Sequence, residues 1–123
     1  LHDICSLNPS FTMILGDINA KSTSWCDHDI ISAEGFRIES LISFYSFSQL
    51  ISTPTHILPT SSSCIDLIFV DQPNIVINSG VHSSLHSNCR HQITFSKLNL
   101  KISYSPPYER IVWDLIRRCW TQR

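Results

Sequence analysis

Two polar residues, Asp17 and Asn19, closely follow a short apolar run in the sequence. This run, residues 11–15, has the length and the residue types of a buried strand. Polar side chains that follow such a strand project from its carboxyl end, which is where α/β proteins bind ligands. Residues two positions apart in an extended chain point to the same side. The carboxylate and the amide together could therefore orient a water or a phosphoryl oxygen beside a metal ion.

A second acid, Asp66, lies in the middle of residues 64–70, which are apolar on both sides of it. A carboxylate in a buried strand is unfavourable unless it is paired, so Asp66 requires a partner. A histidine is a natural one, because an Asp–His pair fixes the imidazole tautomer and raises its proton affinity. His91 is our candidate. We expect Asp66 and His91 to meet beside Asp17 in a single cleft.

Each of these residues also has an ordinary structural interpretation. Asp17 and Asn19 are common turn formers after a strand. Asp66 could lie at a solvated edge of a sheet, and His91 alone would be a plain strand histidine. Only the pairing of Asp66 with His91 favours the chemical interpretation of the histidine.

The elements that must position these groups alternate between strands and helices. The patterns predict strands over residues 11–15, 49–52, 64–70, 74–81 and 91–104. The last segment is either one strand or two strands with a bulge near Lys97. The patterns predict helices over residues 31–50 and 109–120. We expect loops over residues 21–29, 54–63 and 82–90, which are polar or rich in breakers. This order predicts an α/β fold.

The composition excludes several classes of protein. Of the 123 residues, 42% are apolar and 15% are charged, which is too apolar for an intrinsically disordered chain. No apolar run is long enough to span a bilayer, and no basic start followed by an apolar stretch marks a secretory signal. The formal net charge of −1 lacks the surplus of Lys and Arg that strong electrostatic nucleic-acid binders carry.

The cysteines are five in number and widely spaced. An odd count without a secretory signal predicts reduced thiols in a nuclear or cytoplasmic protein that is not secreted. Two of them, Cys26 and Cys89, stand two residues before His28 and His91. This spacing is not that of the usual structural zinc sites, so it disfavours a zinc interpretation.

Several short motifs in the same order resemble the endonuclease/exonuclease/phosphatase superfamily. Residues 15–20 followed by Trp25 resemble its G-D-F-N-A…W block. Residues 64–69 resemble its later S-x-I-D-x-I strand, and Arg90 with His91 stands where that superfamily has its closing S-D-H.

Other segments resemble the version of this domain in endonucleases of LINE-type (non-LTR) retrotransposons. They are residues 53–56 and residues 79–81. Residues 106–110 with Trp113 resemble the stretch that leads from the endonuclease toward the reverse transcriptase. The resemblance thus covers nearly the whole chain.

The resemblance implies a phosphodiesterase that depends on Mg²⁺ and nicks target DNA to prime reverse transcription. It implies that Asp17 activates the attacking water or supports the metal, and that Asn19 orients the phosphate. It further implies that Asp66 holds His91, which contacts the phosphoryl oxygen and stabilises the charge that develops there.

Two departures from the family predict weak activity or none. The family domain is about twice as long as this chain, and its amino-terminal half, which supplies an Asn and the metal-binding Glu, has no counterpart here. Arg90 replaces the Asp of S-D-H. Like charges about 4 Å apart repel by on the order of 4 kcal/mol at an effective dielectric of about 20. Either the metal is lost or Arg90 turns outward.

The sequence therefore predicts an α/β fold that is half of a four-layer α/β-sandwich, truncated at its amino terminus, since the chain opens on Leu1 rather than Met. We expect residues 1–105 to form this partial domain and residues 106–123 to form a helical tail toward a missing downstream domain. Half a sandwich leaves the inner face of a sheet uncovered, which predicts marginal stability or self-association.

The predicted function is that of a remnant of a metal-dependent DNA endonuclease from a retrotransposon. The alternative is a non-catalytic binding or interaction module. Such a module would use the exposed sheet face or the basic tail, which carries Lys97, Lys101, Arg110, Arg117, Arg118 and Arg123.

Overall fold

The computed structural model describes residues 10–26 and 30–100 of the chain. In order, these residues form β1 (Met13–Asp17), α2 (Ala33–Phe44), β2 (Ser48–Gln49), β3 (His56–Leu58), β4 (Ser61–Ser63), β5 (Asp66–Val70), the short 3-10 helix η1 (Pro73–Ile75), β6 (Val76–His82) and β7 (Ile93–Leu98). The described part is therefore a small α/β unit with several antiparallel sheets, in keeping with the predicted fold class. The predicted helix over residues 109–120 and the predicted tail over residues 106–123 lie outside the described residues.

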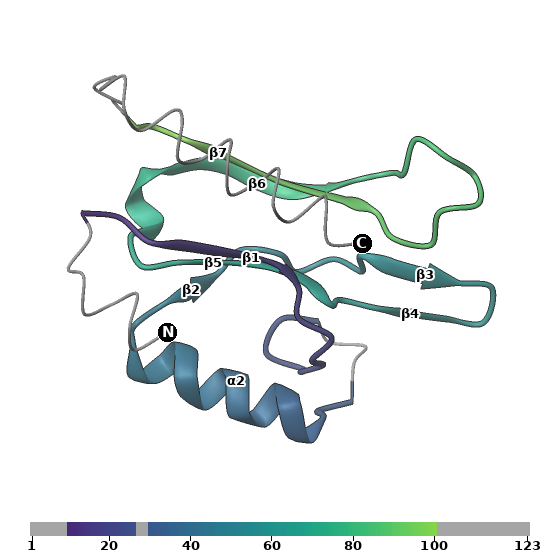
Figure 1. Ribbon diagram of the computed structural model, residues 1–123, viewed down its shortest axis with the longest axis horizontal. Helices are drawn as coiled ribbons and strands as arrows, with labels where there is room; N and C mark the ends of the chain where they lie inside the picture. The colour runs from purple at the N-terminus through teal and green to yellow at the C-terminus, as the bar shows by residue number, and fades with distance from the viewer. Residues whose placement is uncertain (1–9, 27–29, 101–123) are drawn as a thin grey trace, which may run out of the picture.

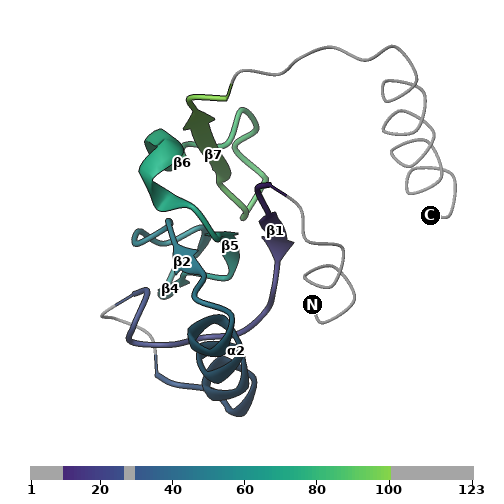
Figure 2. The same cartoon turned by 90° about the vertical axis from the view of Figure 1, so that its left-hand side faces the viewer.

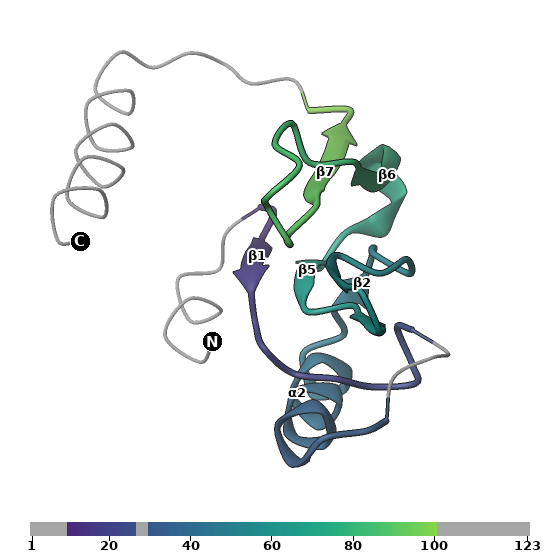
Figure 3. The same cartoon turned by 90° about the vertical axis from the view of Figure 1, so that its right-hand side faces the viewer.

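Three layers make up the arrangement in Figure 1. The central layer is a three-stranded sheet in the order β1–β5–β2, in which β5 is antiparallel to both neighbours. Helix α2 lies on one side of this sheet and the β6–β7 hairpin on the other, as the views from either end in Figures 2 and 3 confirm. The β3–β4 hairpin extends from the end of the sheet at which β5 begins.

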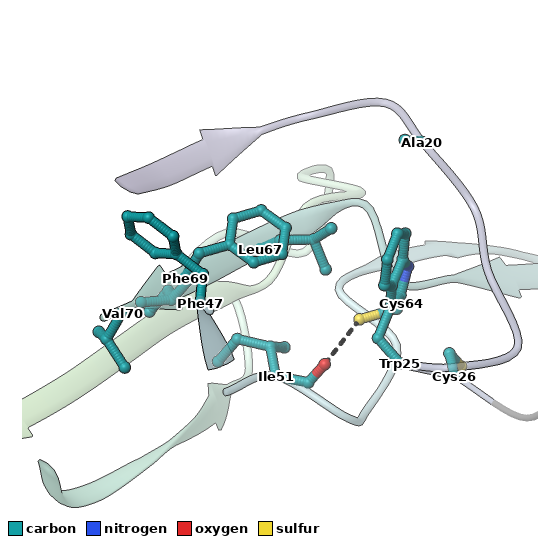
Figure 4. Close-up of a cluster of buried hydrophobic side chains, with 10 residues drawn as sticks. Ala20, Trp25, Cys26, Phe47, Ile51, Cys64, Leu67, Phe69 and Val70 are labelled. Carbon is teal, nitrogen blue, oxygen red and sulfur yellow. Dashed lines mark hydrogen bonds between the residues drawn. The ribbon is translucent and has the colours of Figure 1, made fainter. Parts of the chain in front are cut away.

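Strand β5 is the centre of the hydrophobic core. Its last four residues, 67–70, are all at most 3% exposed, because the strand has neighbours on both edges and layers on both faces. Figure 4 shows Leu67 and Phe69 of this strand with Phe47, Ile51 and other buried side chains gathered along it. The expected uncovered sheet face is therefore wrong for β5, which the β6–β7 hairpin covers from the far side.

The amino-terminal end of α2 is tied to the loop that follows β1. The side chain of Ser32 caps the helix by accepting the Gly35 N–H at 2.9 Å, and its oxygen also accepts the Lys21 N–H. A Cβ at position 35 would lie 1.9 Å from the Lys21 carbonyl oxygen, so only glycine allows this approach. The loop after β1 is thus fixed against the helix.

The carboxyl-terminal end of α2 comes earlier than predicted. The helix ends at Phe44, whereas the apolar pattern predicts it over residues 31–50. Ser46 adopts a left-handed φ of 57°, and its N–H donates to the Ser43 carbonyl while the Phe47 N–H donates to the Ile42 carbonyl. These two bonds form a Schellman motif, which ends a helix and usually uses glycine where this chain has Ser46.

The predicted loop over residues 54–63 is wrong, because this segment contains the β3–β4 hairpin. His56 pairs with Ser63 and Leu58 pairs with Ser61. The other strands are displaced by one to a few residues from their predictions. Strand β1 extends to Asp17, which becomes its last residue, and β5 begins at Asp66 rather than at residue 64.

A bulge near Lys97 is not found within the described part of residues 91–104, because the extra residue lies on the partner strand β6. In the β6–β7 pair, Val76 opposes Leu98 and Asn78 opposes Lys97, so Ile77 is the extra residue of β6. Strand β7 covers only part of the predicted segment 91–104, of which residues 101–104 lie outside the described residues. Within residues 10–26 and 30–100, no helix is long and apolar enough to cross a bilayer.

Candidate active site

Two carboxylates face each other where β1 and β5 meet at one end of the central sheet. Asp17 and Asp66 are direct cross-strand partners in the antiparallel ladder. Asp17 is exposed, whereas the side chain of Asp66 is only 16% exposed. Like charges placed directly opposite each other destabilise a sheet. The pair therefore calls for a positive or proton-donating group beside it.

His91 provides that group. Its Nδ1 lies 3.0 Å from Oδ2 and 3.2 Å from Oδ1 of Asp66. A carboxylate only accepts hydrogen bonds when it is ionised, so this geometry assigns the proton to Nδ1 and makes the imidazole the donor. The side chain of His91 is 42% exposed. Its other nitrogen, Nε2, lies on the opposite edge of the ring and is left to contact a bound molecule.

The three side chains form one compact group. One polar atom from each of Asp17, Asp66 and His91 lies within 4.8 Å of the other two. Asp66 already accepts a hydrogen bond from His91. The more exposed carboxylate of Asp17 is therefore the oxygen ligand best placed for a hard cation. Mg²⁺ prefers oxygen ligands and is commonly held by one or two carboxylates together with waters and substrate phosphates. The donor set at Asp17 fits that chemistry.

The side chain of Thr55 holds the start of β5, and with it Asp66, through hydrogen bonds to backbone amides. It is fully buried, and its Oγ1 accepts the backbone N–H of Ile65 at 3.1 Å and that of Asp66 at 2.9 Å. Ile65 precedes β5 and Asp66 is its first residue, so the hydroxyl supplies an acceptor for two amides at the start of the strand. Thr55 was not predicted from the sequence as part of the site.

The segment that carries His91 is held by the edge of β3. The Gln92 N–H donates to the Thr55 carbonyl, the Ile57 N–H donates to the Arg90 carbonyl, and His56 forms an isolated bridge with His91. Thr55 and the first residue of β3 therefore contact the two partners of the Asp66–His91 pair, Thr55 at the Asp66 amide and His56 at His91.

A family model described as endonuclease-reverse transcriptase matches residues 1–94 of the chain. This match spans more than half of the sequence and includes all four predicted site residues. The chain belongs to this family of retrotransposon endonucleases within the endonuclease/exonuclease/phosphatase superfamily. No curated protein and no solved structure matches the chain.

Asn19 of this endonuclease-type domain does not continue the strand, contrary to the prediction from the sequence. Its backbone has a left-handed φ of 54°, and its N–H donates to Oδ1 of Asp17 at 3.1 Å. The expectation that Asp17 and Asn19 point to one side of an extended chain is therefore wrong. Asp17 is both a turn former and a member of the carboxylate pair.

Arg90, the departure from the S-D-H pattern of the endonuclease family, is exposed. Within the described residues its guanidinium makes no ion pair, and its contribution to the site is the backbone carbonyl that accepts from Ile57. Both outcomes expected for Arg90 stay predictions, because Asp17 at the site is exposed as well.

The Cys–X–His pairs contribute little to the candidate site. Cys89 is exposed and has a free thiol whose Sγ lies 3.3 Å from the His91 carbonyl oxygen. Cys26 is buried with a free thiol, and His28 lies outside the described residues. The compact group at the end of β1 and β5 includes neither cysteine.

Proposed function

We propose that the group formed by Asp17, Asp66 and His91 acts on a phosphodiester of DNA. The observation that carries the proposal is the contact between a poorly exposed carboxylate and a half-exposed imidazole, next to a second, open carboxylate. The carboxylate that accepts from Nδ1 leaves Nε2 facing the bound molecule. When both ring nitrogens carry a proton, Nε2 donates to a phosphoryl oxygen and stabilises the charge that develops there during cleavage. Asp17 activates the attacking water or supports the metal, and Asn19 orients the phosphate.

The cofactor of the proposed reaction is Mg²⁺, held by Asp17. When bound, Mg²⁺ polarises the phosphoryl group and lowers the pKa of a bound water. The residues of the chain perform the other tasks: Asp66 fixes the tautomer of His91, and Asn19 together with Asp17 shapes the turn against which the phosphate would lie.

The proposal includes weak activity or none for these 123 residues alone. Mg²⁺ requires nearly octahedral coordination and releases its waters reluctantly, so one open carboxylate binds it weakly. We further propose that the helix, the central sheet and the β6–β7 hairpin correspond to half of a four-layer sandwich, and that the protein acts on DNA in the nucleus or the cytoplasm.

The test is a nicking assay on supercoiled plasmid DNA with and without Mg²⁺. We expect slow, Mg²⁺-dependent nicking at most, which both Asp17→Ala and His91→Ala reduce to background. Glu34→Ala removes an exposed carboxylate on α2 and is the matched control, which should leave any nicking unchanged. Nicking that survives both site substitutions would show that another protein or another site cleaves the DNA.

A second candidate function is a non-catalytic interaction module. The observation in its favour is the outward surface of the β6–β7 hairpin, where the apolar side chains of Ile77 and Ile93 are 56% and 43% exposed. A partner or a second copy of the chain would cover them. Sedimentation of the chain at increasing concentration tests self-association, which Ile93→Lys should then abolish.

A further inference from the structure

His56, the first residue of β3, is a second imidazole at the candidate active site. Its ring centroid lies 4.7 Å from that of His91, and the two rings are tilted by 49°. The two residues are also paired through their backbones in an isolated bridge. The half-buried ring of His56 therefore covers part of the surface of an imidazole that is itself 42% exposed.

The orientation of the His91 ring requires support of this kind. His91 lies outside the named strands, between the segment 83–90 and β7. Backbone hydrogen bonds with residues 55–57 hold its neighbours Arg90 and Gln92, but they do not fix the torsion of the ring. The terminal torsion of a histidine side chain has two broad, roughly equivalent positions, and rotation between them exchanges Nδ1 with a carbon. Only one of the two positions places Nδ1 on the carboxylate of Asp66.

We propose that His56 is a positioning residue that holds the His91 ring in this orientation by packing against it. The His56 ring fills space beside the imidazole of His91 and restricts its movement away from Asp66. Nδ1 then stays on Asp66 and Nε2 stays directed away from it, toward a bound molecule. The benefit to DNA cleavage rests on the proposed function, whereas the effect on ring orientation does not.

The proposal distinguishes the shape of His56 from its nitrogens. Phenylalanine keeps a flat ring of similar width but has no ring nitrogen, so His56→Phe should preserve the orientation of His91. His56→Ala removes the ring and should release it. Contacts between aromatic rings are modest in energy, so we expect a change of about two- to tenfold in any rate that depends on the orientation.

The direct test is the tautomer of His91, read from the ¹⁵N chemical shifts of its ring nitrogens in the full chain at about pH 8.5, where an ordinary imidazole is neutral. We expect the Nδ1-protonated form in the wild type and in His56→Phe, and a mixture of both tautomers in His56→Ala. Asp66→Asn identifies the ring-nitrogen signals of His91 among those of the other histidines, because His91 is the only histidine of the described residues that is hydrogen-bonded to Asp66. His82→Ala is the matched control, because His82 also stacks on an aromatic ring, that of Phe95 at 4.5 Å, but on the β6–β7 hairpin.

Two results would overturn the proposal. One is a wild-type tautomer ratio in His56→Ala, and the other is a loss of the Nδ1 form in His56→Phe equal to that in His56→Ala. If His56→Ala does not fold, as judged by its amide spectrum, His56→Gln replaces it, since glutamine is polar and lacks a ring. The same outcomes apply to it.

Nicking of plasmid DNA supplies the functional arm. If the wild type nicks, His56→Ala should lower kcat about two- to tenfold with KM unchanged, and His56→Phe should restore it. A wild-type chain that never nicks would contradict the proposed function. The tautomer measurement would still test whether His56 holds the His91 ring. Nicking that is unaffected by a proven loss of the Nδ1 form would contradict the link between orientation and cleavage.

Discussion

Strands β1 and β5 form one antiparallel ladder, and different interactions stabilise its two ends. At one end Met13 pairs with Val70, and the side chains belong to the hydrophobic core or pack against it. At the other end Asp17 pairs with Asp66, and two carboxylates face each other. The core end is stabilised by burial of apolar surface, which needs no particular partner. The acidic end is held from outside the ladder, by Thr55 and by His91.

This difference separates stability from function along a single pair of strands. In the core, any loss of packed volume weakens the fold. At the acidic end, the native arrangement itself contains a repulsion, so some substitutions there should stabilise the protein while they remove its chemistry. Polar groups kept in an unfavourable arrangement are expected where they serve a function.

The largest effect should come from the core end. Leu67 is fully buried in β5, so Leu67→Ala should lower the free energy of unfolding by about 2–5 kcal/mol. Urea unfolding followed by circular dichroism measures it. Leu15→Ala on β1 is the control, because Leu15 is 64% exposed and its truncation should change stability by less than about 0.5 kcal/mol. Equal losses in the two variants would show that β5 is not the centre of the core.

The next largest effect should come from the hydroxyl that supports the acidic end. Thr55→Val keeps the shape of the side chain but leaves the amides of Ile65 and Asp66 without their acceptor. We expect a loss of about 1–3 kcal/mol in urea unfolding, the range for a buried polar group that loses its partner. Thr55→Ser retains the oxygen and should recover most of this loss. A variant as stable as the wild type would mean that the two amides find another acceptor.

A smaller effect of opposite sign should appear at Asp17. Asp17→Asn keeps an oxygen that can accept the Asn19 N–H but removes the charge that faces Asp66. We expect the free energy of unfolding to rise by about 0.2–1 kcal/mol, the range for a cross-strand pair. Thermal unfolding at low ionic strength measures the gain, and added salt should diminish it. A destabilised variant would indicate that the charge of Asp17 is already compensated in the protein.

The smallest effect on stability should come from Glu39, a carboxylate of α2 that accepts hydrogen bonds from the loop after β1. Hydrogen bonds from Ser22 and then Ser24 lower the pKa of Glu39 from its ordinary value of 4.5. Because the folded pKa is the lower one, the stabilisation is complete above about pH 4.5 and is lost as the pH falls through the folded pKa. Acid titration of stability should therefore show a shallower decline in Glu39→Gln than in the wild type. Glu34→Gln, on an exposed carboxylate of the same helix, should follow the wild-type curve.

The parts of the molecule that local chemistry determines could be predicted from the sequence. The apolar run that forms β5 predicts a strand that is buried on both faces. The acid next to it required a partner, and that requirement led to His91. Both inferences hold because burying an unpaired carboxylate is unfavourable in any fold.

Features that depend on distant contacts could not be predicted. Residues 54–63 contain prolines and serines that disfavour a strand, yet β3 forms because its two edges pair with β4 and with residues 90–92. Thr55 and His56 were therefore missed as supports of the site. The end of α2 was missed because Ser46, not glycine, adopts the left-handed conformation there.

The central claim is that a DNA phosphodiester binds against His91 at the acidic end of the β1–β5 ladder. The most direct measurement is a titration of the ¹⁵N-labelled chain with a short DNA duplex in the presence of Mg²⁺. We expect the largest chemical-shift changes on the ring nitrogens of His91 and on the amides of Asp17 and Asp66. Changes confined to residues away from this end, such as Ile77 and Ile93 of the β6–β7 hairpin, would contradict it.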